Sequence, residues 1–455
     1  MKHLNIVLII LIVSSLFSCK KFIEIEPPKN SLVPVAVFKT NELATSALLG
    51  IYLKMATSGF ACGDYNSISV LCGLTADEYL GYGVLLPFSE NQITPETVPN
   101  NSFLWIAMYS NIYNANSILE GLERENGVTP PVKIQLEGEA LFIRAFIYFY
   151  LVNLYGAVPL HLSTDYRVNS NAVRTPVTEI YTQIIKDLQA AESRLNDSYI
   201  TTERVRPNKS AVHALMSRTY LYLGDWTNAE KYASMVIGKT GIYNLTGLNE
   251  VFLKNSAETI WQLMPAANSN TPAGSVLILT TAPTHASLRT QFVTNTFEVN
   301  DQRKTAWVKS FTVGTGTYYY PFKYKVKSSS TVSEYTMVLR LAEQYLIRAE
   351  ARAKQNNLSG AIADIDAIRK RAGLSLIKDA NPNFSLEDLL NIIQKERFTE
   401  LFSEWGDRWF DLKRTGKVTG ALSAIKPGWK STCALFPIPI SEIGNNQKIT
   451  QNDGY

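Results

Sequence analysis

The 455-residue sequence predicts an all-α fold, a frame of dispersed tetratricopeptide-like helix pairs with long loops and minor β elements. The first pair covers 207–237, where a helix, a Gly-Asp turn and a second helix follow one another. Ala229 and Ala233 lie in its second helix, at positions where two helices approach closely. A second pair of this pattern covers 336–371. Because a long segment of different character separates the two pairs, they do not form a tandem array.

The beginning of the chain has the pattern of a lipoprotein signal peptide. A short basic start precedes an apolar run from Leu4 to Phe17, too brief to span a bilayer, and Cys19 follows. We expect cleavage before Cys19 and acylation of that residue, which anchors the protein to a membrane. A plain signal anchor and an unlipidated secretory signal are the alternatives. No later stretch reaches the ~18 apolar residues of a spanning helix, so we expect an anchored protein that does not cross the membrane.

The chain divides into four predicted parts. These are the signal peptide at 1–18, an extended Pro-containing tether at 19–39, an N-terminal helical part at 40–240 and a C-terminal part at 241–455. We expect the last two parts to interlock as one globular unit, and 46% hydrophobic residues are sufficient for a large core.

Helical periodicity begins at Asn41. Further helices are predicted at 101–124, 132–155 and 176–196. Residues 57–100 are rich in Gly, Ser, Thr, Asn and Pro and predict a long irregular loop, a feature that is usually functional. Residues 240–335 have a similar composition with short β-like runs, such as 258–263 and 318–324.

Charge and cysteine content exclude several classes of protein. The formal net charge is +4 and no basic tract exists, so we expect no nucleic-acid partner. Cys62 and Cys72 are close enough in sequence to form a small disulfide, which would leave Cys433 unpaired and buried. No Cys/His set has the spacing of a zinc site, and we expect neither a metal nor a cofactor.

The stretch from Glu396 to Lys417 combines carboxylates, arginines and aromatic rings. Glu396, Glu400 and Glu404 are spaced to line one helical face. We predict a buried lock between helices, in which Arg408 and Arg414 pair with these carboxylates. General acid/base chemistry at the same carboxylates is the alternative.

The same stretch resembles the C-terminal signature of the SusD/RagB family, surface lipoproteins that serve nutrient-uptake transporters of Gram-negative bacteria. The matching features are a Glu-Arg opening, a Glu-(x)-Gly-x-Arg-Trp-x-Asp-Leu core and an Arg-Thr-Gly close. The segment 137–160 is similar to the family's N-terminal hallmark and ends in Tyr-Gly-x-Val-Pro-Leu. The final stretch 435–455 also resembles the family's ending. Trp405 is inserted before Gly406, Asp407 stands where His is frequent, and Gln447 replaces a usual Pro.

This resemblance implies a SusD-like helical frame and a protein that binds its ligand without catalysis. It further implies an outer-membrane lipoprotein that faces the cell exterior and acts as the lid of a TonB-dependent β-barrel transporter (SusC-like). The implied ligand is a polysaccharide or oligosaccharide, although some relatives carry peptides. A helical-repeat scaffold that binds only proteins and a glycoside hydrolase are the alternatives.

Candidate ligand contacts come from the two aromatic-rich regions, 64–82 and 307–324, where the family's ligand sites lie. Sugar rings stack their C–H faces on aromatic rings, while their hydroxyl groups need polar partners. For each candidate, packing beneath its own loop is the alternative. The candidates are Asp64, Tyr65, Asp77, Tyr79, Tyr82, Trp307, Tyr318 and Tyr319. Motifs of metalloproteases, serine hydrolases and phosphate-binding loops are missing. We expect core positions for the tryptophans in helical or strand-like segments, Trp105, Trp226, Trp261, Trp405 and Trp409.

Overall fold

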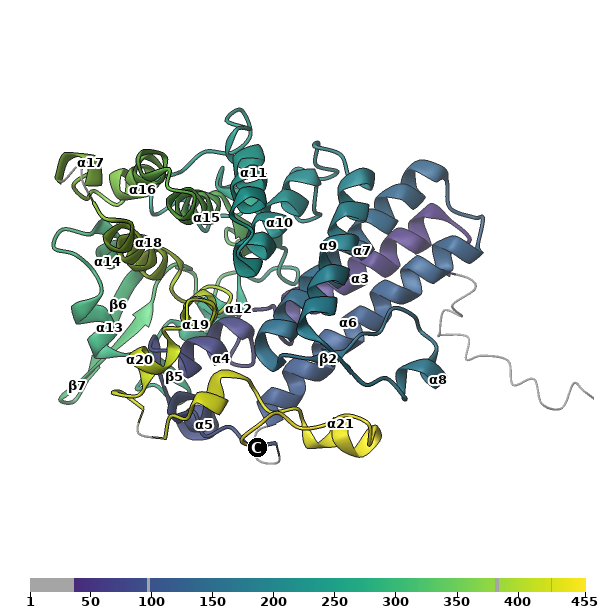
Figure 1. The fold of residues 1–455 in the computed structure, drawn as a ribbon, viewed down its shortest axis with the longest axis horizontal. Coiled ribbons are helices and arrows are strands. Elements are labelled where there is room, and N and C mark those ends of the chain that lie inside the picture. The colour runs from purple at the N-terminus through teal and green to yellow at the C-terminus, as the bar shows by residue number, and fades with distance from the viewer. Residues whose placement is uncertain (1–36, 96–98, 381–383, 427) are drawn as a thin grey trace, which may run out of the picture.

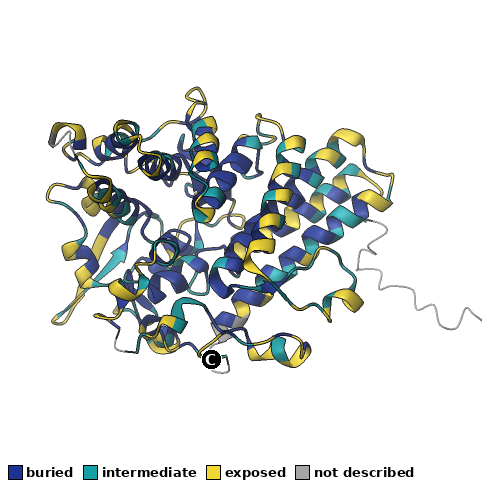
Figure 2. Ribbon diagram, in the orientation of Figure 1, coloured by how far each residue is buried: buried dark blue, intermediate teal, exposed yellow. Residues whose placement is uncertain are grey.

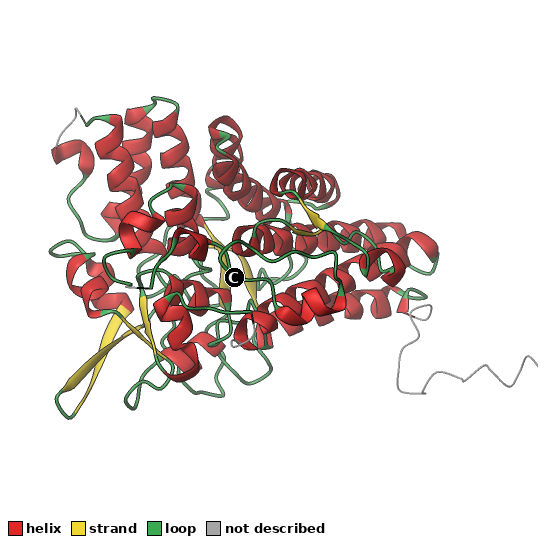
Figure 3. Cartoon of the chain, turned by 60° about the horizontal axis from the view of Figure 1, so that its bottom comes forward, coloured by secondary structure: helices red, strands yellow, loops and turns green. Residues whose placement is uncertain are grey.

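The computed structural model describes residues 37–95, 99–380, 384–426 and 428–455. The predicted signal peptide, Cys19 and most of the predicted tether lie outside these ranges. Helices predominate in the described ranges and the strands are short, which confirms the predicted fold class (Figure 3). No helix in this part of the chain is long and apolar enough to cross a membrane.

Four long helices form one end of the molecule (Figure 1): α3 (Asn41–Thr57), α6 (Pro99–Arg124), α7 (Pro130–Tyr155) and α9 (Val177–Arg194). The predicted bounds of the last three agree within two residues. Almost all of α7 beyond Leu136 is buried (Figure 2), because its neighbours cover it on every side. Arg144 of α7 therefore needs a partner in the interior, and its guanidinium donates two hydrogen bonds of 2.8 and 2.7 Å to the carboxylate of Asp187.

The two predicted helix pairs are present and pack on each other. They are α10 (Lys209–Leu223) with α11 (Trp226–Ile237), and α15 (Leu341–Lys354) with α16 (Leu358–Arg371). Gly224, with φ of 72°, ends α10 in the left-handed conformation that makes the tight turn possible. One apolar cluster contains residues of both pairs, namely Leu221, Ala229, Ala233, Ile347 and Ala351. The small alanine side chains allow this close approach between pairs that are far apart in sequence.

The beginning of the second predicted pair differs from the prediction. Residues 336–340 form a strand, β8 (Thr336–Arg340), which pairs antiparallel with β4 (Thr259–Leu263). Both strands are buried along their whole length. A continuous apolar run bounded by polar residues fits a buried strand as well as a helix, and here the partner strand decides between them.

The C-terminal signature consists of α18 (Leu386–Leu401), a tight turn and α19 (Asp407–Arg414). Because α18 ends at Leu401, Glu404 lies in the turn and not on the helix, contrary to the prediction. Gly406 is required in this turn, since its φ is 73° and an added Cβ would lie 2.7 Å from the Cβ of Cys72.

The predicted loop at 57–100 contains regular structure, so that prediction is wrong. It holds α4 (Ile68–Thr75), β1 (Tyr79–Gly81), η2 (Gly83–Leu85), α5 (Leu86–Glu90) and the start of α6. Ser67 caps α4, and most residues of that helix are buried. Cys62 and Cys72 are both buried free thiols, so the disulfide between them is not formed. Cys433 is also free, but it is only half-buried.

Short elements complete the described part of the chain. The helices are α8 (Tyr166–Asn169), α12 (Pro272–Leu277), α13 (Thr290–Asn295), α14 (Gln302–Trp307), α17 (Ile377–Ala380), α20 (Val418–Leu422), η3 (Ser431–Ala434) and α21 (Ile440–Asn445). The remaining strands are β2 (Val158–Pro159), β3 (Arg174–Thr175), β5 (Ala286–Leu288), β6 (Val308–Val313) and β7 (Gly316–Pro321). The main core lies where α7, β4 and the C-terminal signature meet, and the ring of Phe146 there contacts Trp261 and Trp405 at centroid distances of 5.2 and 5.4 Å.

Candidate functional site

One four-stranded sheet brings the two predicted aromatic regions together. Its strand order is β1-β5-β7-β6, so the strand of the first region and the hairpin of the second lie on either side of β5. Tyr79 pairs with Leu288, and Leu288 pairs with Tyr319. The sequence predicted both regions but not the strand β5 that joins them.

The loop before β5 fixes two of the candidate tyrosines. The ring of Tyr65 stacks on the imidazole of His285, with centroids 4.1 Å apart and an interplanar angle of 11°. The hydroxyl of Tyr65 donates to the carbonyl of Val276 at 2.7 Å. The hydroxyl of Tyr82 is 2.9 Å from the hydroxyl of Ser287, and its backbone N–H donates to the carbonyl of His285. Both rings are half-buried and held in place, and His285 is a site residue that sequence reasoning missed.

The hairpin β6–β7 presents aromatic rings on its two faces. Strand alternation places Tyr319 on the face that packs against the core, and Tyr318 and Tyr320 on the opposite face. Tyr318 pairs across the hairpin with Phe311, and the ring of Tyr320 lies edge-on to Phe322 at 6.1 Å.

Two lysines surround this hairpin face. The ammonium groups of Lys309 and Lys325 lie 5.9 and 5.6 Å from the ring centroid of Phe322. Burial lowers the pKa of Lys325 below its usual value. Aromatic faces beside ammonium donors offer both kinds of contact that a sugar ring needs. The predicted ligand contacts did not include Tyr320 and Phe322, although both lie within a few residues of Tyr318 and Tyr319 in the sequence.

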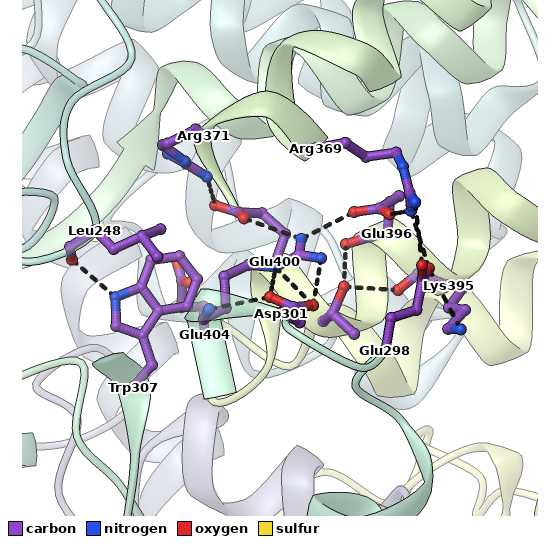
Figure 4. A network of polar contacts seen from close by, with 12 residues as sticks. Leu248, Glu298, Asp301, Trp307, Arg369, Arg371, Lys395, Glu396, Glu400 and Glu404 are labelled. Carbon is purple, nitrogen blue, oxygen red and sulfur yellow. Dashed lines mark hydrogen bonds and ion pairs between the residues drawn. The ribbon is translucent and has the colours of Figure 1, made fainter. Parts of the chain in front are cut away.

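Three candidates have structural roles. Tyr79 is fully buried and its hydroxyl donates to the hydroxyl of Ser403 at 2.7 Å. Trp307 is also fully buried, and its indole N–H donates to the carbonyl of Leu248 at 2.9 Å (Figure 4). Neither ring has a face open to a ligand, so we do not retain these two as contacts. The carboxylate of Asp77 accepts two hydrogen bonds from the guanidinium group of Arg408.

Asp64 lies beside Tyr65 at the edge of the site. Its carboxylate accepts the backbone N–H of Asn66 at 2.8 Å, and burial raises its pKa above the usual value. Asp64, Tyr65, Tyr82, Tyr318 and Tyr319 therefore remain as candidate contacts, all of them half-buried.

A buried ion-pair network lies next to Trp307, at the start of the hairpin β6–β7 (Figure 4). Glu396 accepts hydrogen bonds from Arg303 at 2.9 Å and from Arg369 at 2.5 Å. Arg303 belongs to α14, the helix that leads into β6, and Glu396 belongs to α18. The network thus joins the base of the hairpin to the C-terminal signature.

The predicted lock of carboxylates is confirmed, but its basic partners differ from the prediction. Glu400 pairs with Arg303, Arg340 and Arg371, and Glu404 pairs with Arg340 and Lys323. Burial opposes ionisation of Glu400, yet the surrounding arginines hold its pKa well below the usual value.

The two predicted partners contact other acids. Arg408 pairs with Asp77, and Arg414 pairs with Glu350 and Asp411. The three carboxylates of the lock have side chains exposed by 9% or less and are saturated with cations, as in a structural network. Within the described ranges, no group of His, Cys, Asp and Glu is arranged to hold a metal ion.

Four of the five tryptophans expected in the core are buried there: Trp105, Trp261, Trp405 and Trp409. Trp226 is half-buried at the start of α11.

Two protein-family models match the sequence of this chain. A family model described as "Starch-binding associating with outer membrane" matches residues 29–221, and the model of the SusD family matches residues 291–455. A SusD-like protein of Formosa agariphila is 24% identical over 100% of this chain and 99% of its own length. The starch-binding protein SusD of Bacteroides thetaiotaomicron is 25% identical over 73% of this chain and 75% of its own.

Solved structures share the fold. A SusD superfamily protein of Bacteroides vulgatus has a TM-score of 0.80 at 22% identity, covering 92% of this chain and 99% of that one. A laminarin-binding SusD-like protein has a TM-score of 0.77 at 24% identity, covering 92% and 100%. The solved structures show the fold, and the matching family models define a carbohydrate-binding class associated with the outer membrane. The chain belongs to its SusD/RagB family.

Proposed function

We propose that this protein is a cell-surface lipoprotein that binds a glycan or oligosaccharide and acts as the lid of a TonB-dependent outer-membrane transporter. In this proposal Cys19 carries the lipid anchor and 19–39 is the tether. The ligand is trapped between this chain and a SusC-like β-barrel and is then released inward. The barrel supplies the energy of uptake, so the chain needs no cofactor and no catalytic group.

The observation that carries the proposal is the aromatic surface on the sheet. Tyr318 and Tyr320 are held on the paired strand β7, Tyr82 directly follows β1, and each of the three keeps part of its ring exposed. Rings that are fixed before the ligand arrives lose little conformational freedom on binding. Asp64 and Lys309 at the margin provide an acceptor and a donor for sugar hydroxyl groups.

The names of relatives support the choice of a glycan as ligand. One structural neighbour is a laminarin-binding protein, and one sequence relative binds starch. Laminarin and starch are both polymers of glucose. Because only about a quarter of the residues are identical, the linkage that these relatives prefer is not assigned to this chain. The proposal therefore commits to a saccharide and leaves the polymer to experiment.

The acidic lock supports a binding protein over a hydrolase. A glycosidase needs one carboxyl group free to give up a proton and one free to act as base or nucleophile. Glu396, Glu400 and Glu404 are each committed to buried arginine or lysine partners, and none of them reaches the sheet surface.

The test is a pull-down of the tagged full-length protein from its native membranes in mild detergent, with mass spectrometry of the partners. We expect a large β-barrel protein in near-equal amount, and loss of that barrel from the membrane pull-down with Cys19→Ala, which cannot be acylated. Recovery of the chain alone, or with soluble proteins only, would contradict the lid role. Thermal stabilisation of the chain by at least one member of a glycan panel tests ligand binding separately.

A further inference from the structure

A cavity lies away from the sheet site, between α6, α8 and α21. In Figure 1, α8 and α21 are at the right of the lower edge, whereas the hairpin β6–β7 is at the left. The cavity has a volume of about 330 Å³, at the lower end of the roughly 300–1,000 Å³ typical of small-molecule sites. It is lined by side chains from all three helices and from the strand β2, and aromatic residues are prominent among them.

Three rings in tilted contact with one another form one wall of this cavity. The ring of Trp105 is 4.8 Å from that of Tyr109, and Tyr109 is 5.1 Å from the imidazole of His161. The hydroxyl of Tyr109 donates to the carbonyl of Pro159 at 2.8 Å, which fixes the middle ring. The wall is therefore rigid and aromatic before any ligand binds.

Two further tyrosines stand at the entrance with their rings in solvent. Tyr113 is 53% exposed and Tyr166 is 76% exposed. Within the described part of the chain, no hydrogen bond to either hydroxyl is formed. A single exposed aromatic residue needs no explanation, but two such rings at the entrance of one aromatic cavity form a surface on which a flat, partly apolar ligand can stack.

Polar side chains also line the same space. The Nε2 atom of His161 is buried and has no hydrogen-bond partner among the described residues. The protein therefore covers this atom, and it is the ring of His161 that forms part of the cavity wall. The side-chain amide of Asn445 lines the cavity, and no bond from it is formed within the described ranges.

Glu442 is the charged residue among those that line this cavity. Burial raises the pKa of its carboxyl group, and a hydrogen bond with Trp105 opposes that rise. Among the described residues, no lysine or arginine lines the cavity, so an anionic ligand would lack a counter-charge. A purely apolar ligand would displace water from the carboxylate of Glu442 and the amide of Asn445 without replacing the hydrogen bonds of that water.

We propose that this cavity, defined by Trp105, Tyr109, Tyr113, His161, Tyr166 and Glu442, is a second binding site for a neutral saccharide of one or two rings. The C–H faces of the sugar stack on the tyrosine rings at the entrance. Its hydroxyl groups bond to the carboxylate of Glu442 and the side-chain amide of Asn445. This site does not depend on the sheet surface, and it gives one chain two separate contacts for a branched or long glycan.

Histidine signals allow both sites to be tested in one experiment. His161 lies in the cavity wall and His285 lies in the sheet site, so each imidazole reports on its own site. The full-length protein, labelled with ¹³C in its histidine rings and held in detergent, is titrated with glucose, galactose, mannose, xylose and their disaccharides. The variants His161→Gln and His285→Gln assign the two signals. We expect at least one neutral sugar to shift the His161 signal in a saturable manner.

Matched variants separate stacking from general effects. Tyr113→Ala combined with Tyr166→Ala should weaken the His161 response about tenfold, the loss expected from about 1.4 kcal/mol of stacking. Val168→Ala, which changes an exposed residue of α8 outside the cavity lining, should leave the response unchanged. Tyr82→Ala should also leave it unchanged.

The outcomes distinguish this inference from the proposed function. A response at His285 alone would overturn the second site while leaving the sheet site intact. A response at His161 alone would support the second site and count against the sheet surface. If tetramethylammonium shifts His161 and no sugar does, the cavity is a site for an amine and the saccharide assignment is wrong.

Discussion

The guanidinium group of Arg408 holds the carboxylate of Asp77 with hydrogen bonds of 2.8 and 2.6 Å, although 331 positions separate the two residues. Arg408 belongs to α19, and Asp77 lies two residues before β1. The same guanidinium lies 3.9 Å from the ring centroid of Phe398. The C-terminal signature thus clamps the strand that begins the aromatic sheet.

Replacing Arg408 by Lys should weaken this clamp. Lysine keeps the charge but cannot reproduce the planar two-pronged contact with the carboxylate or the stacking on Phe398. We expect Arg408→Lys to lower the free energy of unfolding by about 1–3 kcal/mol, measured by urea unfolding. As a control, Arg167→Lys alters the solvent-exposed pair with Asp165 and should have no measurable effect. Equal stability of Arg408→Lys and the wild type would show that the clamp contributes nothing.

Glu400 is the central carboxylate of the buried lock. Removing its charge with Glu400→Gln leaves Arg303, Arg340 and Arg371 without their shared counter-charge in the interior. Breaking a buried network in this way costs about 3–5 kcal/mol, and we expect a corresponding fall in the free energy of unfolding in urea. Lys395→Gln changes a half-exposed cation at the margin of the lock and should be nearly neutral. If Glu400→Gln lowers the free energy of unfolding by less than Lys395→Gln does, the lock has no structural role.

Glu78 should make stability depend on pH. The side chain is buried and accepts the backbone N–H of Ser403 at 3.1 Å. Burial raises the pKa of its carboxyl group from 4.5 to about 8. Between these values the folded state keeps a proton that the unfolded state releases. Its stabilising contribution is therefore complete below about pH 4.5 and is lost as the pH rises to about 8.

The variant Glu78→Gln isolates this effect, because glutamine is isosteric and does not titrate. Between about pH 5 and 8 the free energy of unfolding of the wild type should fall more steeply than that of the variant. The difference in slope should reach up to about 1.4 kcal/mol per pH unit. Urea unfolding at several pH values measures both slopes. Parallel curves would show that Glu78 keeps an ordinary pKa in the folded protein.

Local signals were sufficient to predict the helices. The turn at Gly224 and the small residues Ala229 and Ala233 mark the first helix pair without knowledge of its neighbours. The helix α4 was missed because its eight residues are too few for a clear period and lie in a segment of loop-like composition.

Long-range partners could not be predicted from one sequence. The three glutamates of the signature were identified, but Arg303 and Arg340 are distant in the chain and no local pattern links them to the lock. Likewise, the aromatic content of 64–82 and 307–324 indicated a site, while burial decided which rings are available. Trp307 is covered by the core and Tyr318 is not, although both lie in the same aromatic-rich region.

This difference in burial predicts opposite behaviour for variants of the half-buried tyrosines and of the buried tryptophan. Tyr318→Ala and Tyr82→Ala should each weaken binding of a laminarin or starch oligosaccharide about three- to tenfold, because each loses one stacking ring, about 0.5–1.5 kcal/mol. Their thermal unfolding should match the wild type. Trp307→Ala should instead destabilise the fold by about 3–5 kcal/mol, since it empties a fully buried position and leaves the carbonyl of Leu248 without its donor.

Isothermal titration calorimetry with the two oligosaccharides, run beside thermal unfolding of each variant, separates these effects. Phe103→Ala is the control, because it removes a solvent-exposed aromatic ring from α6, outside the sheet and outside the second cavity. It should change neither affinity nor stability. If both tyrosine variants bind as tightly as Phe103→Ala, the glycan does not stack on this face of the sheet. The proposed site would then have to be sought elsewhere on the family fold.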